Sequence, residues 1–188
     1  VAFGRGQTAR VATAGLNPSE REFHDEDGRE LATDRRRFLH RTGAEQREPS
    51  DAEILEARRL AEGYFELGNA YTDWFLGFAP LLEELGCSYQ TGRACHTDYV
   101  SPFTTRVGIG AVQSAARRIL RQDGLPRWRA LLECMPECRI VVGIGAGWST
   151  IPSALGFKKW EPVPTPLDRK GGNTRSPRPH LLHATHSL

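Results

Sequence analysis

Four short apolar stretches of the sequence each run into residues that could do chemistry. The stretches are 10–15, 94–100, 139–145 and 180–185. The residues at or beyond their ends are Leu16, Asn17, Pro18, Ser19, Asp98, Gly147, Trp148, Ser149, His186, Ser187 and Leu188. An amide, a carboxyl group and an imidazole brought together could orient water, accept hydrogen bonds and donate one.

The elements that must position these groups are predicted from apolar periodicity. Each stretch is rich in β-branched or other apolar residues and stops at Gly, Pro or polar residues, which is typical of a buried strand. Segments with the apolar spacing of helices lie between these stretches. This alternation of strands and helices favours a parallel sheet covered by helices. We therefore expect one α/β domain over residues 1–188, with three α/β/α layers and a four-stranded, mainly parallel sheet. Strand ends would then share one edge, so Asn17, Asp98, Gly145 and His186 are expected to line one cleft.

Several helix boundaries are also predicted. Ser50 and Glu53 have the spacing of a capping box that opens a helix. A second apolar face spans 74–85, and Pro80 should kink that helix or mark its first turn. A helix over 109–121 should stop at Gly124, and another should open at Pro126. Residues 1–9 are expected to be a polar lead-in, residues 161–179 a long loop, and the aromatic stripes part of the core.

The composition is that of an ordinary globular protein. The chain has 188 residues, of which 39% are hydrophobic and 26% charged. No apolar run approaches the ~20 residues of a membrane span, and the N-terminus has no apolar leader, so we expect no membrane contact. The four cysteines do not suggest a secreted disulfide scaffold, which favours an intracellular location in the cytoplasm or nucleoid. We expect a monomer.

The net charge of +2 hides an asymmetry along the chain. Residues 1–102 hold 12 Lys and Arg against 18 Asp and Glu, whereas residues 103–188 hold 13 against 5. A basic half suits a partner that bears phosphate groups, such as DNA. The alternative is a solvated face, because 22 of the 25 cations are Arg, a bias that genome composition can produce.

The motifs resemble those of the uracil-DNA glycosylase superfamily. Gly15-Leu-Asn-Pro18 is similar to the Gly-Ile-Asn-Pro-Gly signature of its mismatch-specific branch, and Leu181–Leu188 looks like the strand that runs into His-Pro-Ser-Pro-Leu. Asp98-Tyr-Val-Ser-Pro102 lies where members carry an Asn at the end of the second strand. Together the motifs cover nearly the whole chain, which is expected to be a member of that superfamily by this resemblance.

The resemblance implies a monofunctional DNA glycosylase of base excision repair that flips a damaged base out of DNA and hydrolyses its N-glycosidic bond. Asn17 would orient water and His186 would donate to the departing base. Leu16, Phe23 and Asp98 would contact the base, with Phe23 stacking on it; the alternative for Phe23 is a plug over the core. The expected DNA contacts are Pro18, Ser19, Gly147, Trp148, Ser149, Ser187 and Leu188.

Three departures from the family pattern bear on the substrate. Asp98 replaces an Asn, and an ionised carboxylate only accepts hydrogen bonds, so it suits an amino-bearing base edge better than uracil. Ser187 stands where the family has Pro. The chain stops where a DNA-inserting loop and a final helix should follow, so we expect a chain shortened at its C-terminus or a divergent member.

Other interpretations remain open at the level of sequence. Val141-Val-Gly-Ile-Gly-Ala-Gly147 resembles the glycine-rich loop of nucleotide- or S-adenosylmethionine-binding enzymes. A non-catalytic nucleic-acid-binding relative is a further alternative. Cys87, Cys95, Cys134 and Cys138 do not have the spacing of the family's iron–sulfur branch, so we expect buried free thiols and neither metal nor cofactor. No Lys lies at a strand end, which argues against an amine nucleophile.

Overall fold

The computed structural model describes residues 2–39, 48–66, 68, 71–101 and 109–144, and the backbone of 160–162 and 179–183. Its strands are β1 (Ala2–Phe3), β2 (Val11–Gly15), β3 (Ala94–Asp98), β4 (Ile140–Ile144), β5 (Trp160–Pro162) and β6 (Pro179–His183). Its α-helices are α1 (Asp51–Glu62), α2 (Thr72–Leu76), α3 (Ala79–Glu84) and α4 (Ser114–Glu133). Short 3₁₀ helices span Glu20–Glu22, Thr33–Arg35 and Ile109–Ala111.

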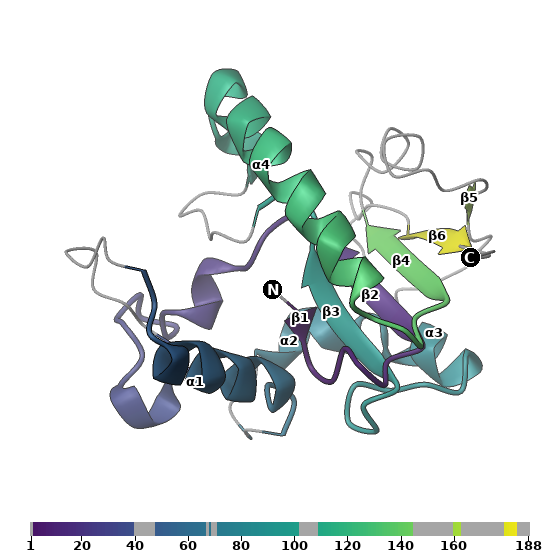
Figure 1. Ribbon diagram of the computed structural model, residues 1–188, viewed down its shortest axis with the longest axis horizontal. Coiled ribbons are helices and arrows are strands. Elements are labelled where there is room, and N and C mark those ends of the chain that lie inside the picture. Colours follow the sequence, from purple (N-terminus) through teal and green to yellow (C-terminus); the bar gives the residue numbers. More distant parts are fainter. Residues whose placement is uncertain are drawn as a thin grey trace.

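The strands form one mixed sheet in the order β1-β3-β2-β4-β6-β5 (Figure 1). β2 is the parallel neighbour of both β3 and β4, and its last residue, Gly15, lies opposite Asp98. The other pairings, β1 with β3, β4 with β6 and β5 with β6, are antiparallel. The α/β class is thus confirmed, but the expected four-stranded, mainly parallel sheet is wrong.

The fourth predicted strand has the opposite direction to the one expected. β6 is antiparallel to β4, with Pro179 opposite Ile144 and His183 opposite Ile140. Its C-terminal end therefore lies at the sheet edge where β2 and β4 begin, away from Gly15. An apolar run does not encode its direction, which depends on the route of the connecting chain.

Helices cover both faces of the central strands, because successive side chains of a strand point to opposite faces. On one face Ala12, Ala14 and Cys95 pack with Trp128 of α4, and Figure 1 shows α4 crossing that face. On the other face Val11 and Ala94 pack with a cluster from the segments around α1, α2 and α3, which includes Tyr64, Phe75, Phe78 and Leu82. The aromatic stripes are thus largely core, as predicted.

The N-terminal lead-in belongs to the core. Phe3 is 1% exposed and packs against Tyr64, Phe38 and His96, with ring centroids 5.1 to 5.5 Å apart. Because β1 also pairs with β3, the expectation of a polar lead-in is wrong. The stretch is too short for periodicity to reveal it.

Helix boundaries agree with the sequence in α1 and differ in α4. Ser50 and Glu53 form the predicted capping box. By contrast, α4 runs unbroken from Ser114 to Glu133 through Gly124 and Pro126, so the predicted stop and restart are wrong. A Cβ on Gly124 would lie 2.0 Å from the carbonyl oxygen of Val100, so this glycine permits close packing of helix against strand end and does not end the helix.

Candidate functional site

The turn after β2 is held in place by backbone hydrogen bonds from the segment after β3. The carbonyl of Gly15 accepts from Tyr99 N at 3.0 Å, and that of Leu16 accepts from Val100 N at 3.0 Å. Asn17 follows at once, is partly buried, and its side-chain amide donates to the Pro18 carbonyl at 3.1 Å. The local structure thus fixes Asn17 at the C-terminal edge of the parallel strands.

Ser19 starts the next element. Its hydroxyl accepts from Arg21 N at 3.2 Å and caps the 3₁₀ helix Glu20–Glu22. That helix carries Glu22 back over the sheet edge, where its side chain is buried. A polar loop in the sequence is therefore folded onto the ends of β2 and β3.

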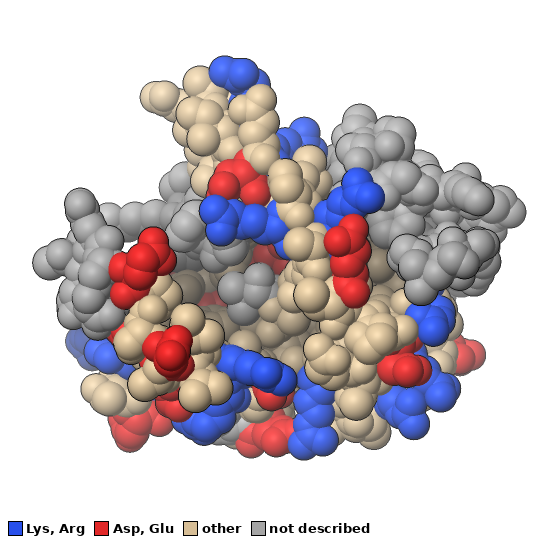
Figure 2. Space-filling model, in the orientation of Figure 1, with Lys and Arg blue, Asp and Glu red and all other residues tan. Residues whose placement is uncertain are grey.

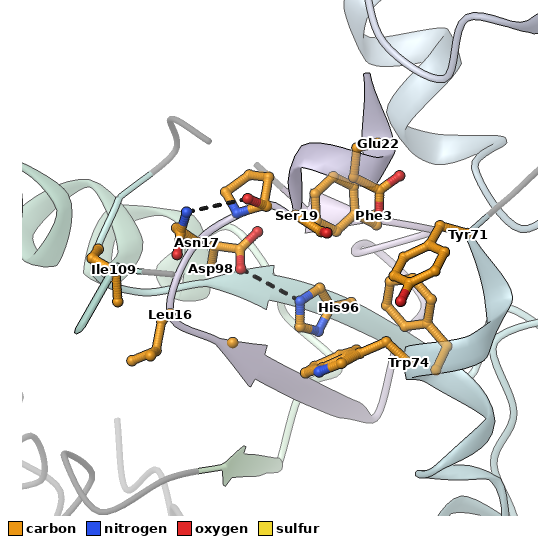
Figure 3. Close-up of a pocket in the computed structure, with 13 residues that line it drawn as sticks. Phe3, Leu16, Asn17, Ser19, Glu22, Tyr71, Trp74, His96, Asp98 and Ile109 are labelled. Atoms are coloured by element: carbon orange, nitrogen blue, oxygen red, sulfur yellow. Dashed lines mark hydrogen bonds and ion pairs between the residues drawn. The ribbon is translucent and has the colours of Figure 1, made fainter. Parts of the chain in front are cut away.

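These segments enclose a pocket of about 320 Å³ (Figure 3), a size typical of sites for small molecules and cofactors. The described residues that line it come from β1, the end of β2 and its turn, the 3₁₀ helix Glu20–Glu22, the segments before and within α2, β3, and the 3₁₀ helix before α4. They are Phe3, Gly15, Leu16, Asn17, Pro18, Ser19, Glu22, Tyr71, Trp74, Phe75, His96, Asp98 and Ile109.

His96 and Asp98 point to the same face of β3 because they are two residues apart. His96 Nε2 lies 3.5 Å from Asp98 Oδ1, and both side chains are almost fully buried. On the other side of the ring, Nδ1 lies 2.9 Å from the Thr13 hydroxyl oxygen. That oxygen also lies 2.7 Å from the Tyr89 hydroxyl and 3.3 Å from the Cys95 carbonyl oxygen.

The position of the ring proton of His96 decides whether a donor or a lone pair faces Asp98. The Thr13 hydroxyl has one proton to donate. If it donates to His96 Nδ1, a neutral imidazole ring carries its proton on Nε2. If the Thr13 hydroxyl donates to the Cys95 carbonyl instead, His96 Nδ1 must donate to the Thr13 oxygen. A neutral ring would then direct the lone pair of Nε2 toward the Asp98 carboxylate, and the two would repel. The tautomer with the ring proton on Nε2 would direct an N–H toward Asp98 Oδ1.

Asp98 has no hydrogen-bond partner for either carboxylate oxygen within the described part of the chain. Buried polar atoms are rarely left unsatisfied, so a carboxylate of this kind is suited to accept donors from a bound molecule. Gly15, opposite in the sheet, makes room for it, since a Cβ there would lie 3.0 Å from Asp98 Oδ1.

Glu22 is a second buried carboxyl group of the pocket. Tyr64 donates its hydroxyl proton to Glu22 Oε2 at 2.6 Å, and Arg37 Nη1 lies 3.7 Å from the same oxygen. Burial raises the pKa of Glu22 to about 7 from the ordinary 4.5, and the charge of Asp98 raises it further, while Tyr64 and Arg37 lower it. Glu22 therefore changes its charge near neutral pH.

Aromatic rings form the remaining wall of the pocket. Trp74, Tyr71, Phe75 and Phe3 all line it. Trp74 packs edge-on against His96 with centroids 4.7 Å apart, while the Arg21 guanidinium lies 5.6 Å from the Tyr71 ring. The site thus combines a planar, apolar wall with accepting groups, which suits a flat heterocycle.

Five of the predicted site residues come together in this pocket, and a sixth described one, Phe23, is not part of its lining. Leu16, Asn17, Pro18, Ser19 and Asp98 all line it. Phe23 is absent from the described lining and packs against Phe38 with centroids 5.6 Å apart.

The remaining predicted residues lie outside the described residues: Gly145, Gly147, Trp148, Ser149, His186, Ser187 and Leu188. The direction of β6 removes the argument that brought His186 to the same edge as Asn17. The role of His186 therefore stays a prediction from the motif alone.

Sequence reasoning missed His96, Glu22, Tyr71 and Trp74 as pocket residues. His96 could have been found, because it lies two positions before Asp98 in a strand and must share its face. Trp74 was assigned to the core, and it is both packed on His96 and 36% exposed. Nothing in the sequence places Glu22 there, since it depends on the fold of the turn.

The surface charges of the described residues are mixed. Figure 2 shows basic and acidic side chains interspersed over the face that α4 crosses. On α4, Arg127 pairs with Asp123 and Arg129 with Glu133. The described basic side chains therefore do not form a continuous basic patch on that face.

The four cysteines differ in their burial. Cys87 and Cys95 are buried and Cys134 is exposed, so the expectation of buried thiols holds for only part of the set. Burial raises the pKa of the Cys138 thiol to about 11. Within the described residues, no cluster of His, Cys, Asp or Glu is arranged to hold a metal ion, and no helix has the length and apolarity to span a membrane.

Comparison with known proteins gives no family model, no curated protein and no solved structure with significant similarity to this chain. The fold and the pocket therefore define an α/β protein with a small, buried, acceptor-rich site at the C-terminal edge of β2 and β3.

Proposed function

We propose that this protein is a monofunctional DNA glycosylase that takes a flipped base into the pocket beside Asn17 and Asp98. The observation that carries the proposal is the buried Asp98 carboxylate, with no described hydrogen-bond partner, at the same sheet edge as Asn17. An orphaned acceptor beside a partly buried amide suits chemistry in which a cation develops and water attacks.

The pocket suits one heterocyclic base. Its volume of about 320 Å³ is at the small end of ligand sites, and aromatic side chains supply a stacking wall. Enzymes that act on a base in DNA must extrude it from the stack, and a flipped base needs stacking partners and edge contacts. Trp74 and Tyr71 line the pocket and are suited to stacking, whereas Phe23 packs against Phe38.

The mechanism follows from the residue types. Cleavage of an N-glycosidic bond builds positive charge on the sugar, and a nearby carboxylate stabilises such charge in a site shielded from water. Asp98 would supply this charge, and the Asn17 carbonyl would orient the attacking water. His96, 3.5 Å from Asp98, would hold the carboxylate in position. His186 would donate to the departing base, as the motif implies.

The direct test is strand nicking, after alkali treatment, of duplex oligonucleotides that each carry one altered base: uracil, hypoxanthine, xanthine or a mismatched thymine. The expected result is cleavage of at least one substrate by the wild-type chain and a loss of about 10²–10³ in rate for Asn17→Ala, as for loss of a stabilising group. Asp98→Asn should shift preference toward uracil, because an amide offers both a donor and an acceptor.

A matched control is Asp123→Asn, since Asp123 is an exposed carboxylate on α4 that pairs with Arg127. This variant should keep the wild-type rate. A covalent DNA adduct trapped by borohydride would show an amine nucleophile and contradict the monofunctional scheme. Binding to DNA with no nicking of any of the four substrates would instead favour a non-catalytic binding protein.

A further inference from the structure

The described wall of the pocket contains one deeply buried acceptor, the Asp98 carboxylate. The Asp98 side chain is 1% exposed and its two oxygens lack described hydrogen-bond partners. Two neighbouring polar groups are already placed: the Asn17 amide donates to the Pro18 carbonyl, and His96 Nε2 lies 3.5 Å from Asp98 Oδ1. No Lys or Arg is among the described lining residues. A molecule that binds against Asp98 is therefore favoured if it brings a donor or positive charge to that carboxylate.

The aromatic part of the wall has the same preference. The faces of Trp and Tyr rings carry partial negative charge and attract cations within about 6 Å. Trp74 and Tyr71 line the pocket together with Asp98 and Glu22; since the Arg21 guanidinium already lies 5.6 Å from the Tyr71 ring, Trp74 is the ring expected to attract a bound cation. Arg37 Nη1 lies 3.7 Å from the Glu22 carboxylate and partly offsets its negative charge. Asp98 has no Lys or Arg paired to it among the described residues.

We infer that the pocket is selective for a base with positive charge on its ring, an N-alkylated purine, over neutral uracil. This inference rests on the proposed glycosylase function and names its substrate class. It is carried by the aromatic wall and by the buried Asp98 carboxylate, whose oxygens have no hydrogen-bond partner among the described residues; Figure 3 shows both facing one space.

The leaving group supports the same assignment. When the N-glycosidic bond of an alkylated purine breaks, both bonding electrons go to the ring nitrogen and cancel its positive charge, so the base leaves neutral. Water adds to the anomeric carbon of the sugar and loses one proton to solvent. Uracil would instead leave as an anion beside Asp98 and Glu22, where like charges repel. An alkylated purine therefore needs no donor from the described wall.

The test is equilibrium binding of free nucleosides, which does not require hydrolysis. N7-methylguanosine, at a pH where its ring is cationic, is compared with guanosine and deoxyuridine by titration of the intact chain. Wild-type protein should bind the methylated nucleoside about tenfold more tightly than either neutral one, as one charge-assisted contact provides. Asp98→Asn and Trp74→Leu should each reduce the preference severalfold, whereas Asp123→Asn should keep it.

Circular dichroism and thermal melting of each variant establish that it is folded, and Trp74 is exposed enough for its truncation to be tolerated. Equal binding of the three nucleosides, or a preference that survives Asp98→Asn, would overturn the inference. The nicking assay, extended to DNA with N7-methylguanine, separates the two proposals. Excision of uracil but not of methylated guanine would overturn this inference alone, whereas selective cation binding without excision of any base would support the pocket chemistry and overturn the glycosylase function.

Discussion

Gly15 lies directly opposite Asp98 in the parallel pairing of β2 and β3, and a Cβ on Gly15 would lie 3.0 Å from Asp98 Oδ1. That Cβ would also lie 3.2 Å from His96 Nε2. Both distances are shorter than ordinary van der Waals contacts, so the glycine is what allows the two side chains to meet over the strand end.

Gly15→Ala should therefore displace Asp98 and His96. Overpacking of a tight site costs about 1–3 kcal/mol, and the displaced groups are those proposed to act on the substrate. We expect a modest fall in melting temperature and at least about a tenfold loss of activity or ligand binding, since 1.4 kcal/mol is tenfold. Gly110→Ala is the control, because nothing lies within 4 Å of a Cβ there. Wild-type binding by Gly15→Ala would show that the contact does not position the site.

Glu22 should make stability depend on pH. Its pKa is raised from 4.5 to about 7 in the folded state, so between these values the folded chain binds more protons than the unfolded chain. The free energy of unfolding should accordingly fall as pH rises from about 4.5 to about 7, and Glu22 should add no further slope above that. Urea unfolding across this range measures the slope.

Glu22→Gln should flatten this part of the profile, because glutamine does not titrate and can still accept from the Tyr64 hydroxyl. Glu62→Gln serves as the control, since Glu62 is an exposed partner of Arg58 and should leave the slope unchanged. An unchanged slope in Glu22→Gln would contradict the assignment of this titration to Glu22.

Thr97 anchors α4 to the sheet. Trp128 Nε1 donates to the Thr97 hydroxyl at 2.9 Å, and that hydroxyl donates to the Thr13 carbonyl at 3.2 Å, all in the buried core. Thr97→Val has nearly the same shape but leaves the indole N–H unsatisfied, which should cost about 1–3 kcal/mol. Chemical denaturation measures the loss. Exposed Thr33→Val should change stability little, and an equal effect of both substitutions would exclude this anchor.

The sequence was sufficient for the elements with strong local signals. β2, β3 and β4 lie within a residue or two of the predicted positions, and Ser50 opens α1 as expected. The convergence of Asn17 and Asp98 followed from parallel pairing alone. These features depend on periodicity and capping, which are written in neighbouring residues.

Other features depend on contacts between distant segments. The direction of β6 is set by a long connection, and the continuity of α4 through Pro126 is supported by burial of Trp128 against the sheet. Ile54 of α1 is 51% exposed although it is a large apolar residue, whereas Tyr64, just after α1, is fully buried in the core. Tertiary packing overrides local preference at such positions.

His96 should act as a positioning residue for Asp98. His96→Phe keeps a ring that can stack on Phe3, as His96 does with planes 8° apart, but removes the N–H that faces Asp98. The contact is 3.5 Å long and is not a hydrogen bond, so we expect about a tenfold loss in kcat, which corresponds to about 1.4 kcal/mol, with little change in KM.

His96→Gln should restore part of the rate, because its amide can donate to Asp98 while its carbonyl accepts from Thr13. A merely structural role for the ring would give the opposite order, with the Phe variant more active than the Gln variant. Single-turnover kinetics on the best oligonucleotide substrate separates the two outcomes. Melting temperatures of the two variants, compared at the same pH, show whether folding contributes to the difference.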